Sequence, residues 1–148
     1  MKITEAAPSD ALTAELIALS ERWEAENCTH GYRKNNPEDL FGRRVFLAAE
    51  RGRTVGYLFG KVQKAEQTTS VMREGTPYFE LEELYVVPER RSQGIGSALF
   101  RYAENALRGE ADYILLSTAT KNFRAILHFY LDELGMEFWN ARLYRKLT

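Results

Sequence analysis

The sequence contains very little cysteine, histidine or proline, and its charges nearly cancel. Its 148 residues include one Cys, two His and four Pro, with 20 Lys plus Arg against 21 Asp plus Glu. Cys28 alone excludes an intramolecular disulfide and a cysteine-based zinc cluster, and two distant histidines without consistently spaced carboxylates indicate no metal site. A net charge of −1 and a pI near 6.2 argue against a general nucleic-acid binder, which needs a basic surplus.

Long apolar runs are also missing. No segment reaches the roughly 18 to 20 apolar residues that cross a bilayer, and residues 1–10 lack the pattern of a secretory leader. We therefore expect no membrane association and a reducing, cytoplasmic location. The chain does contain 45% hydrophobic and 12% aromatic residues, which suffice for one core. No repeat or linker divides it, so residues 1–148 are expected to form a single domain.

Periodic patterns predict alternating helices and strands. Apolar residues at every third or fourth position predict one helix from Ser9 or Asp10 to about Asn27, and another from Gly94 to just before Gly109. Turn-forming residues in 28–44 leave room for at most one short helix. The remaining predictions are strands over residues 3–6, 45–50, 54–62, 79–87, 113–117 and 141–147, and a last helix over 123–135.

The turn after the strand 79–87 carries the strongest functional signal. It reads Arg91-Ser92-Gln93-Gly94-Ile95-Gly96-Ser97 and leads directly into a helix. Glycines let backbone amides approach a ligand, and a helix N-terminus adds partial positive charge, so the turn suits phosphate oxygens. It is not a dinucleotide-binding fingerprint, because Leu99 stands at the third glycine position, and it is not a Walker loop. The spacing alone leaves a purely structural turn equally open.

This stretch resembles the GCN5-related N-acetyltransferase (GNAT) superfamily. The family signature Q/R-x-x-G-x-G/A is met by residues 91–96, and the flanking residues 84–88 and 97–100 also resemble the family. The order of predicted elements agrees over nearly all of the chain. The resemblance implies a mixed α/β (α+β) fold with a largely antiparallel central sheet, flanked by helices and splayed where acetyl-coenzyme A (acetyl-CoA) binds.

The resemblance also implies which residues hold the coenzyme. In the family, the strand backbone binds the pantetheine arm and the glycine turn binds the pyrophosphate. Asn122, at the start of the last helix, corresponds to a further coenzyme contact of relatives. The other contacts carried over are Leu84, Tyr85 and Val86 on the strand, and Arg91, Ser92, Gln93, Gly94, Ile95, Gly96 and Ser97 in the turn.

Acetyl transfer to an amine needs a proton acceptor, because an aliphatic amine stays protonated near pH 7. Strand alternation places Glu80 and Glu82 on one face and Glu83 on the other. We expect Glu82, with Glu80 and through a water, to accept the proton, and Glu83 to attract a cationic substrate. The alternative is that these carboxylates face solvent or pair with Arg or Lys. Residues 81–86 also resemble the acidic strand of polyamine acetyltransferases.

Tyr130 is the candidate acid that protonates the departing coenzyme A thiolate. The family's last helix reads A-x-x-x-Y-x-x-x-G-F, whereas Ala125 and Gly135 each stand five residues from Tyr130. The helix therefore either bulges or places Phe129 at the usual position, and a merely structural Tyr130 is the alternative. His30 and Tyr32 lie in the loop where relatives build the acceptor pocket. They are expected to line the substrate site, although a solvated loop is the other interpretation.

Together these features predict an acetyl-CoA-dependent N-acetyltransferase. The expected acceptor is a primary amine of a small cationic molecule, attacked directly in a ternary complex because no motif supports a covalent intermediate on Cys28. A protein or peptide acceptor and a non-catalytic acyl-CoA sensor remain as alternatives. The formation of a homodimer is also left open.

Overall fold

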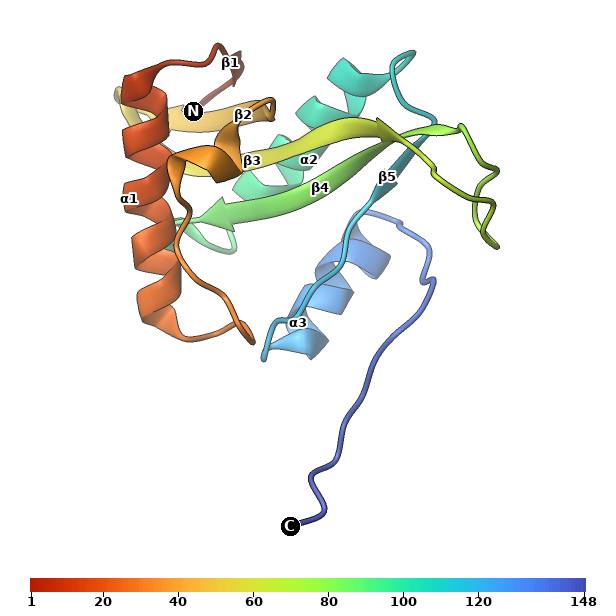
Figure 1. The fold of residues 1–148 in the computed structure, drawn as a ribbon. Helices are drawn as coiled ribbons and strands as arrows, with labels where there is room; N and C mark the ends of the chain where they lie inside the picture. The colour runs from red at the N-terminus through yellow and green to blue at the C-terminus, as the bar shows by residue number, and fades with distance from the viewer.

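A computed structural model describes residues 1–148, and its central feature is a five-stranded sheet in the order β1-β2-β3-β4-β5. Neighbours from β1 to β4 are antiparallel, whereas β5 pairs with β4 in parallel. The predicted mixed, largely antiparallel sheet is thus confirmed (Figure 1). The strands are β1 (Lys2–Ala6), β2 (Arg44–Glu50), β3 (Arg53–Lys64), β4 (Pro77–Val86) and β5 (Tyr113–Leu115).

Two long helices cover opposite faces of the sheet (Figure 1). The helix α1 (Asp10–Glu26) begins where the Ser9 hydroxyl accepts a hydrogen bond from Leu12 N–H, and it ends at Asn27 in the left-handed conformation. The helix α2 (Ile95–Leu107) packs its apolar side on the other face. Short 3₁₀ helices, η1 (Pro37–Leu40) and η2 (Pro88–Arg90), lie in the connections. None of the helices combines the length and apolar character needed to cross a membrane.

The last helical segment changes its geometry halfway. The helix α3 (Phe123–Leu127) continues directly into the π-helix η3 (His128–Glu133). The backbone N–H of Leu134 donates to the carbonyl of Phe129, five residues earlier, at 3.0 Å. A π-helix holds more residues per turn than an α-helix. The irregular spacing around Tyr130 is therefore accommodated by a bulge.

A β-bulge interrupts the pairing of β3 with β4. Gly60 pairs with Leu81 and Phe59 with Glu83, so Glu82 is the extra residue. Glu80 pairs with Lys61, and Glu83 pairs with Phe59. Lys61 and Phe59 are two residues apart on β3 and point to the same face of the sheet, so Glu80 and Glu83 also share that face. The prediction that placed Glu83 on the opposite face from Glu80 is therefore wrong. A bulge inserts one extra residue and so shifts the alternation of side chains by one position. A prediction that assumes regular alternation cannot detect this shift.

The sheet splays beyond the start of β4. The parallel pairing of β4 with β5 covers only Tyr78–Glu80 and Tyr113–Leu115, and the two strands then diverge (Figure 1). Residues 81–86 of β4 therefore have an edge without a neighbouring strand. This opening leads toward the N-terminus of α2, as the resemblance implied.

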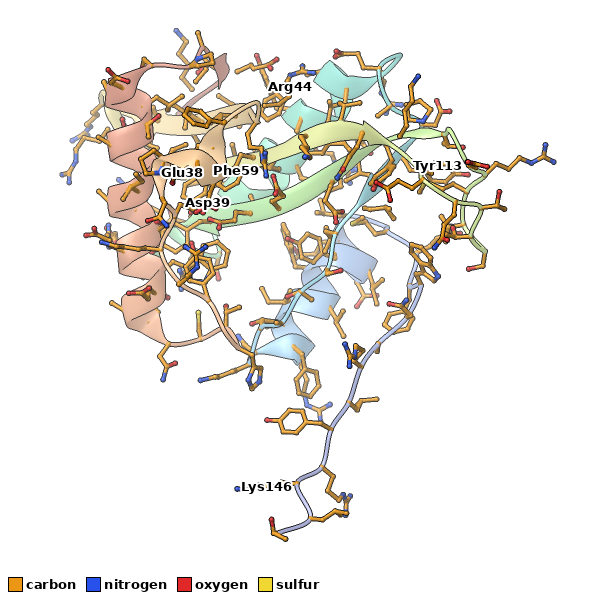
Figure 2. All side chains as sticks on the ribbon, in the orientation of Figure 1. Glu38, Asp39, Arg44, Phe59, Tyr113 and Lys146 are labelled. Carbon is orange, nitrogen blue, oxygen red and sulfur yellow. The ribbon has the colours of Figure 1, made fainter.

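The C-terminal residues depart from the prediction. No strand forms over residues 141–147, and the end of the chain projects away from the body, with Lys146 far from the sheet (Figures 1 and 2). A lone strand has no partner for its backbone groups, so its hydrophobic alternation does not suffice to order it. The strand β5 is also shorter than the predicted 113–117, and Tyr113 at its start is 41% exposed because β5 is the edge of the sheet.

Candidate active site

The turn between β4 and α2 presents backbone N–H groups without protein partners. Gly94 caps the helix with a φ of 82°, and Ser92 has a φ of 61°. No side chain caps α2, and its first backbone bond runs from Ala98 N–H to the Gly94 carbonyl, so the N–H groups of residues 95–97 remain free. Residues 91–94 are exposed. Free N–H groups at the positive end of a helix dipole suit a phosphate anion.

Arg91 is held by the protein. Its guanidinium forms two bonds with the Glu26 carboxylate, at 2.6 and 2.8 Å, and its Nε donates to the Val86 carbonyl at 2.9 Å. The Tyr85 hydroxyl donates to the same carboxylate at 2.9 Å. Although burial favours the neutral acid, the bonds from Arg91 and Tyr85 lower the pKa of Glu26 below its ordinary value. Arg91 thereby ties α1 to the end of β4, and its charge stays beside the turn.

A cage of three donors surrounds one oxygen of Glu83. Its Oε1 accepts hydrogen bonds from Tyr57 Oη at 2.8 Å, Tyr32 Oη at 3.0 Å and Asn35 Nδ2 at 3.0 Å. Burial raises the pKa of Glu83 more than these bonds lower it. Burial and the charge of Glu83 raise the pKa of both tyrosines, which therefore stay protonated donors. The other oxygen, Oε2, has no protein partner and is free to accept a hydrogen bond from a cationic group.

The two neighbouring glutamates have different surroundings. At the bulge, Glu82 forms a forked ion pair with Arg43, with Nε–Oε1 at 2.5 Å and Nη2–Oε2 at 3.0 Å. Glu80, which is half-buried, has no hydrogen bond or ion pair within the protein. Burial and then the charge of Glu82 raise the pKa of Glu80. The alternative that the strand carboxylates pair with arginine thus holds for Glu82 and not for Glu80.

Glu80 should make the stability of the fold depend on pH. Its pKa in the folded chain lies above the ordinary value of 4.5, so the folded state binds this proton more tightly than the unfolded state does. The Glu80 contribution to the free energy of unfolding should therefore fall as pH rises from 4.5 through the raised pKa of the folded chain, because the unfolded state releases the proton first. Urea unfolding should show Glu80→Gln more stable than the original chain at about pH 8 and equal to it at about pH 4.

The matched control for this measurement is Glu15→Gln. Glu15 lies on the exposed side of α1 and forms no ion pair. Its substitution should leave the difference between the two pH values unchanged. If the stability difference between Glu80→Gln and the original chain is the same at both pH values, the folded structure does not raise the pKa of Glu80.

The π-helix gives two adjacent aromatic residues separate positions. Phe129 Cζ lies 3.2 Å from the place that a Cβ would take on Gly96, so Phe129 packs on the turn at the start of α2. Tyr130 packs partly buried against the core, with its ring centroid 5.0 Å from that of Phe129. Burial raises the pKa of Tyr130 to about 12, so its hydroxyl remains protonated at neutral pH. Phe129, which has no hydroxyl, thus contacts the turn, and the adjacent Tyr130 carries a hydroxyl that stays protonated.

Of the residues predicted to line the acceptor site, the structure brings Tyr32 and Glu83 together and leaves His30 apart. Tyr32 stacks on Trp23, with ring centroids 4.2 Å apart, and reaches Glu83 with its hydroxyl. His30 is exposed and makes no side-chain hydrogen bond. Asn122 is the exposed N-cap residue of α3, and its side chain is likewise without a protein partner.

Sequence reasoning missed the residues that orient these groups. They are Glu26, Asn35, Arg43 and Tyr57. Their contacts join positions that are 26 to 65 residues apart in the chain. Tyr57 could have been found only from the pairing of β3 with β4, because Phe59 pairs with Glu83 and Tyr57 lies two residues away on the same face. The other three had no local signal. No group of three or more His, Cys, Asp or Glu side chains is arranged to hold a metal ion.

The family model described as the acetyltransferase (GNAT) family matches residues 11–136. The matched range runs from α1 through the π-helix and includes the glycine turn and the three strand glutamates. The chain therefore belongs to the GNAT family and is an N-acetyltransferase, as the signature of residues 91–96 implied. No curated protein sequence matches the chain.

Solved structures of the same fold include several aminoglycoside acetyltransferases. One, from an uncultured soil metagenomic sample and in complex with sisomicin, has a TM-score of 0.71 and 22% identity over 99% of this chain and 96% of the other. AAC(6')-IG from Acinetobacter haemolyticus has a TM-score of 0.66 and 19% identity over 100% of this chain and 99% of the other. AAC(6')-Iy in complex with coenzyme A has a TM-score of 0.67 and 16% identity over 99% of this chain and 100% of the other. At these identities the likeness establishes the fold.

Proposed function

We propose that this N-acetyltransferase transfers the acetyl group of acetyl-CoA to a primary amine of a small cationic molecule, by direct attack in a ternary complex. One observation carries the proposal. The free N–H groups at the start of α2 stand at one end of the open β4 edge, and three glutamates stand along the same strand. An anion site and an acidic site are therefore joined by a strand with unpaired backbone groups.

The residues present fit acetyl-CoA. GNAT enzymes use this coenzyme, and the free N–H groups of residues 95–97 suit its pyrophosphate. We place the pantetheine arm along the open edge at Leu84, Tyr85 and Val86. The Leu84 backbone and the Val86 N–H are available to its amides, as a sheet edge is to an added strand, whereas the Tyr85 backbone faces β3 and the Val86 carbonyl already accepts from Arg91. We place the exposed Asn122 on the other side of this opening. The bound thioester supplies an activated acetyl group.

The acidic site favours a cationic acceptor. Glu83 Oε2 is unpartnered and half-buried, and Glu80 lies on the same face of β4. A protonated amine would be drawn to these carboxylates, because an opposite charge in a partly desolvated site interacts strongly. Aminoglycosides, named in several of the structures with this fold, are small polyamines of this kind. Tyr32 gives the site an aromatic wall.

In the reaction, Glu82 accepts the proton of the ammonium group, with Glu80 and through a water. The neutral nitrogen then forms a bond to the acetyl carbonyl carbon, the carbon–sulfur bond breaks, and the second proton of the attacking nitrogen leaves to water as the amide forms. Tyr130 donates its proton to the departing thiolate and is reprotonated from solvent. General acid–base catalysis by two such groups accounts for proton movement without a covalent intermediate on the enzyme.

A screen with the purified protein tests the proposal. Calorimetry measures acetyl-CoA binding, and release of free thiol is followed with aminoglycosides and polyamines in one arm and with peptides bearing a free N-terminus or lysine in the other. We expect binding, and thiol release with the small amines. Preferred acetylation of peptides would contradict the acceptor class. Binding without thiol release across both arms would indicate a sensor, and no binding would overturn the proposal altogether.

A further inference from the structure

Four polar side chains lie next to one another on the face of β3 and β4 that carries Glu83. Residues two apart on β3 share a face of the sheet, and the residues paired with them on β4 share the same face. The two pairs that follow Glu83 toward the end of β3 supply these side chains. They are Lys61 with Glu80 and Gln63 with Tyr78, and the four residues are here called the polar floor.

No residue of the polar floor has a partner within the protein. All four are half-buried, yet none of their side chains makes a hydrogen bond or an ion pair. No fully buried polar side-chain atom lacks a partner, so the polar atoms of the floor are open to solvent. The neighbouring Glu83 Oε1, by contrast, has three donors. The floor can therefore exchange its water for a polar part of a ligand without breaking bonds within the protein.

Lys61 is the cation that this face leaves free. Arg43, the other cation beside the glutamates, is bound to both oxygens of Glu82 and donates to the Phe41 carbonyl at 2.9 Å. The ammonium group of Lys61 has three N–H donors and forms no ion pair, although Glu80 stands opposite on β4. The site therefore offers a free cation next to its free carboxylates.

The spacing of these charges suits a molecule that has both an ammonium group and a carboxylate. Lys61 is two residues from Phe59, the partner of Glu83, and two residues of a strand span about 7 Å. An acceptor whose ammonium group lies at Glu83 can therefore reach Lys61 with its other end. The side-chain amine of a basic amino acid lies at a comparable distance from its carboxylate. A lysine ammonium binds a carboxylate through charge-assisted hydrogen bonds.

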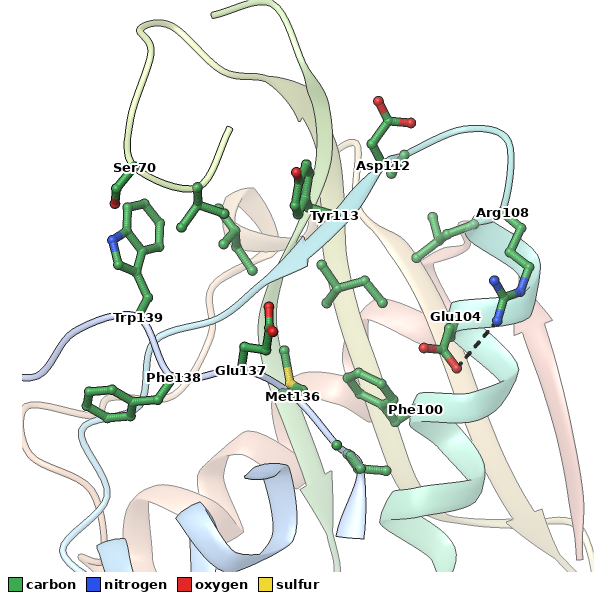
Figure 3. A pocket seen from close by; sticks show the side chains of 17 residues that line it. Ser70, Phe100, Glu104, Arg108, Asp112, Tyr113, Met136, Glu137, Phe138 and Trp139 are labelled. Carbon is green, nitrogen blue, oxygen red and sulfur yellow. Dashed lines mark ion pairs between the residues drawn. The ribbon is translucent and has the colours of Figure 1, made fainter. Parts of the chain in front are cut away.

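A groove of about 700 Å³ beside β5 does not offer the same chemistry (Figure 3). None of the residues of the polar floor lines it. Its charged lining consists of Glu104, Asp112 and Glu137 against the single Arg108, which faces Glu104 at 3.9 Å (Figure 3). Such a surface repels a carboxylate. The anionic end of an acceptor is therefore better placed on the floor than in this groove.

We propose that the acceptor is a small amine that also carries a carboxylate, such as a basic amino acid, and that Lys61 binds this carboxylate. Glu83 then holds the ammonium group, while Gln63 and Tyr78 offer neutral hydrogen-bonding groups beside Lys61. Lys61 is in this way a specificity-determining residue. The inference rests on the proposed function, because it takes the glutamates of β4 as the place where the amine binds.

Kinetics with amines that differ in one carboxylate test this inference. L-lysine is compared with cadaverine, which is lysine without its carboxyl group, by thiol release at saturating acetyl-CoA. We expect kcat/KM to be about 10- to 100-fold higher for lysine, the range that a hydrogen bond to a charged group contributes. L-lysinamide, which keeps both amines but has no carboxylate, should behave like cadaverine. In Lys61→Met the preference for lysine should fall below about threefold, mainly through a higher KM for lysine, with cadaverine unchanged.

Two further variants control for charge and position. Lys64→Met should keep the preference for lysine, because Lys64 is exposed and lies three residues from Lys61, on the opposite face of β3. Lys61→Arg should keep most of it, because the positive charge is retained. Equal kcat/KM for lysine and cadaverine, or a preference that survives in Lys61→Met, would overturn this inference alone. Thiol release with none of the small amines would overturn the proposed function, and the inference with it.

Discussion

Replacing Glu82 by glutamine should lower kcat/KM for the best amine acceptor by about 100- to 10,000-fold, the range that general base catalysis contributes. Glutamine keeps the size of the side chain but cannot take a proton. The ion pair with Arg43 is also lost, but a partly exposed pair of this kind contributes only about 1 kcal/mol or less to stability. Steady-state kinetics at saturating acetyl-CoA measure the effect, and calorimetry should show coenzyme binding unchanged.

Three companion variants define what this result means. Glu15→Gln, which is remote from β4, should retain full activity. Glu83→Gln should act mainly on KM for a cationic acceptor, because Glu83 is proposed to attract the substrate. If Glu80→Gln loses far more activity than Glu82→Gln, the proton acceptor is Glu80, whose raised pKa would then be part of the mechanism. Full activity in Glu82→Gln would remove Glu82 from the chemistry.

Gly94→Ala should weaken coenzyme binding at least tenfold, which corresponds to about 1.4 kcal/mol. Gly94 has a φ of 82°, and no atom lies within 4 Å of the place for a Cβ, so the added methyl meets open space where the phosphates are proposed to bind. A non-glycine residue in this conformation also costs roughly 1–2 kcal/mol of stability. Calorimetry with coenzyme A and urea unfolding measure the two effects separately.

Gly109→Ala is the matched control, because Gly109 has a φ of 85° and equally open surroundings at the far end of α2. Both substitutions should destabilise the chain by a similar amount, and only Gly94→Ala should impair coenzyme binding. Equal coenzyme affinity in the two variants would show that the turn at residues 91–97 is a structural connection and not a phosphate site.

Much of the fold was accessible from local patterns. The boundaries of α1 follow from the Ser9 cap and from Asn27, and the hairpin of β2 and β3 follows from alternation on either side of Gly52. These elements depend on interactions between residues close in sequence, so a single sequence records them. Residues 141–147 were also predicted to form a strand, and they form none. A strand needs a neighbour, and the pattern does not state whether one is available.

The site was predictable only where one short segment builds it. The free N–H groups of the α2 turn depend on Gly94 and on the start of a helix, both of which the sequence displays. The surroundings of the glutamates depend on residues distant in the chain, such as Tyr57 and Arg43. The bulge at Glu82 brings Glu83 to the face of Glu80, and this shift arises from pairing with β3, not from β4 itself.

The sequence by itself therefore determined the family, the order of most elements and the anion-binding character of the turn, because each rests on contiguous residues. The tertiary structure decided three further matters. It divided the glutamates into an Arg43-paired Glu82, a caged Glu83 and an unpartnered Glu80. It resolved the spacing around Tyr130 as a π-helix, and it left residues 141–147 without a neighbouring strand. Each of these depends on strand register or packing between distant segments, which no local pattern encodes.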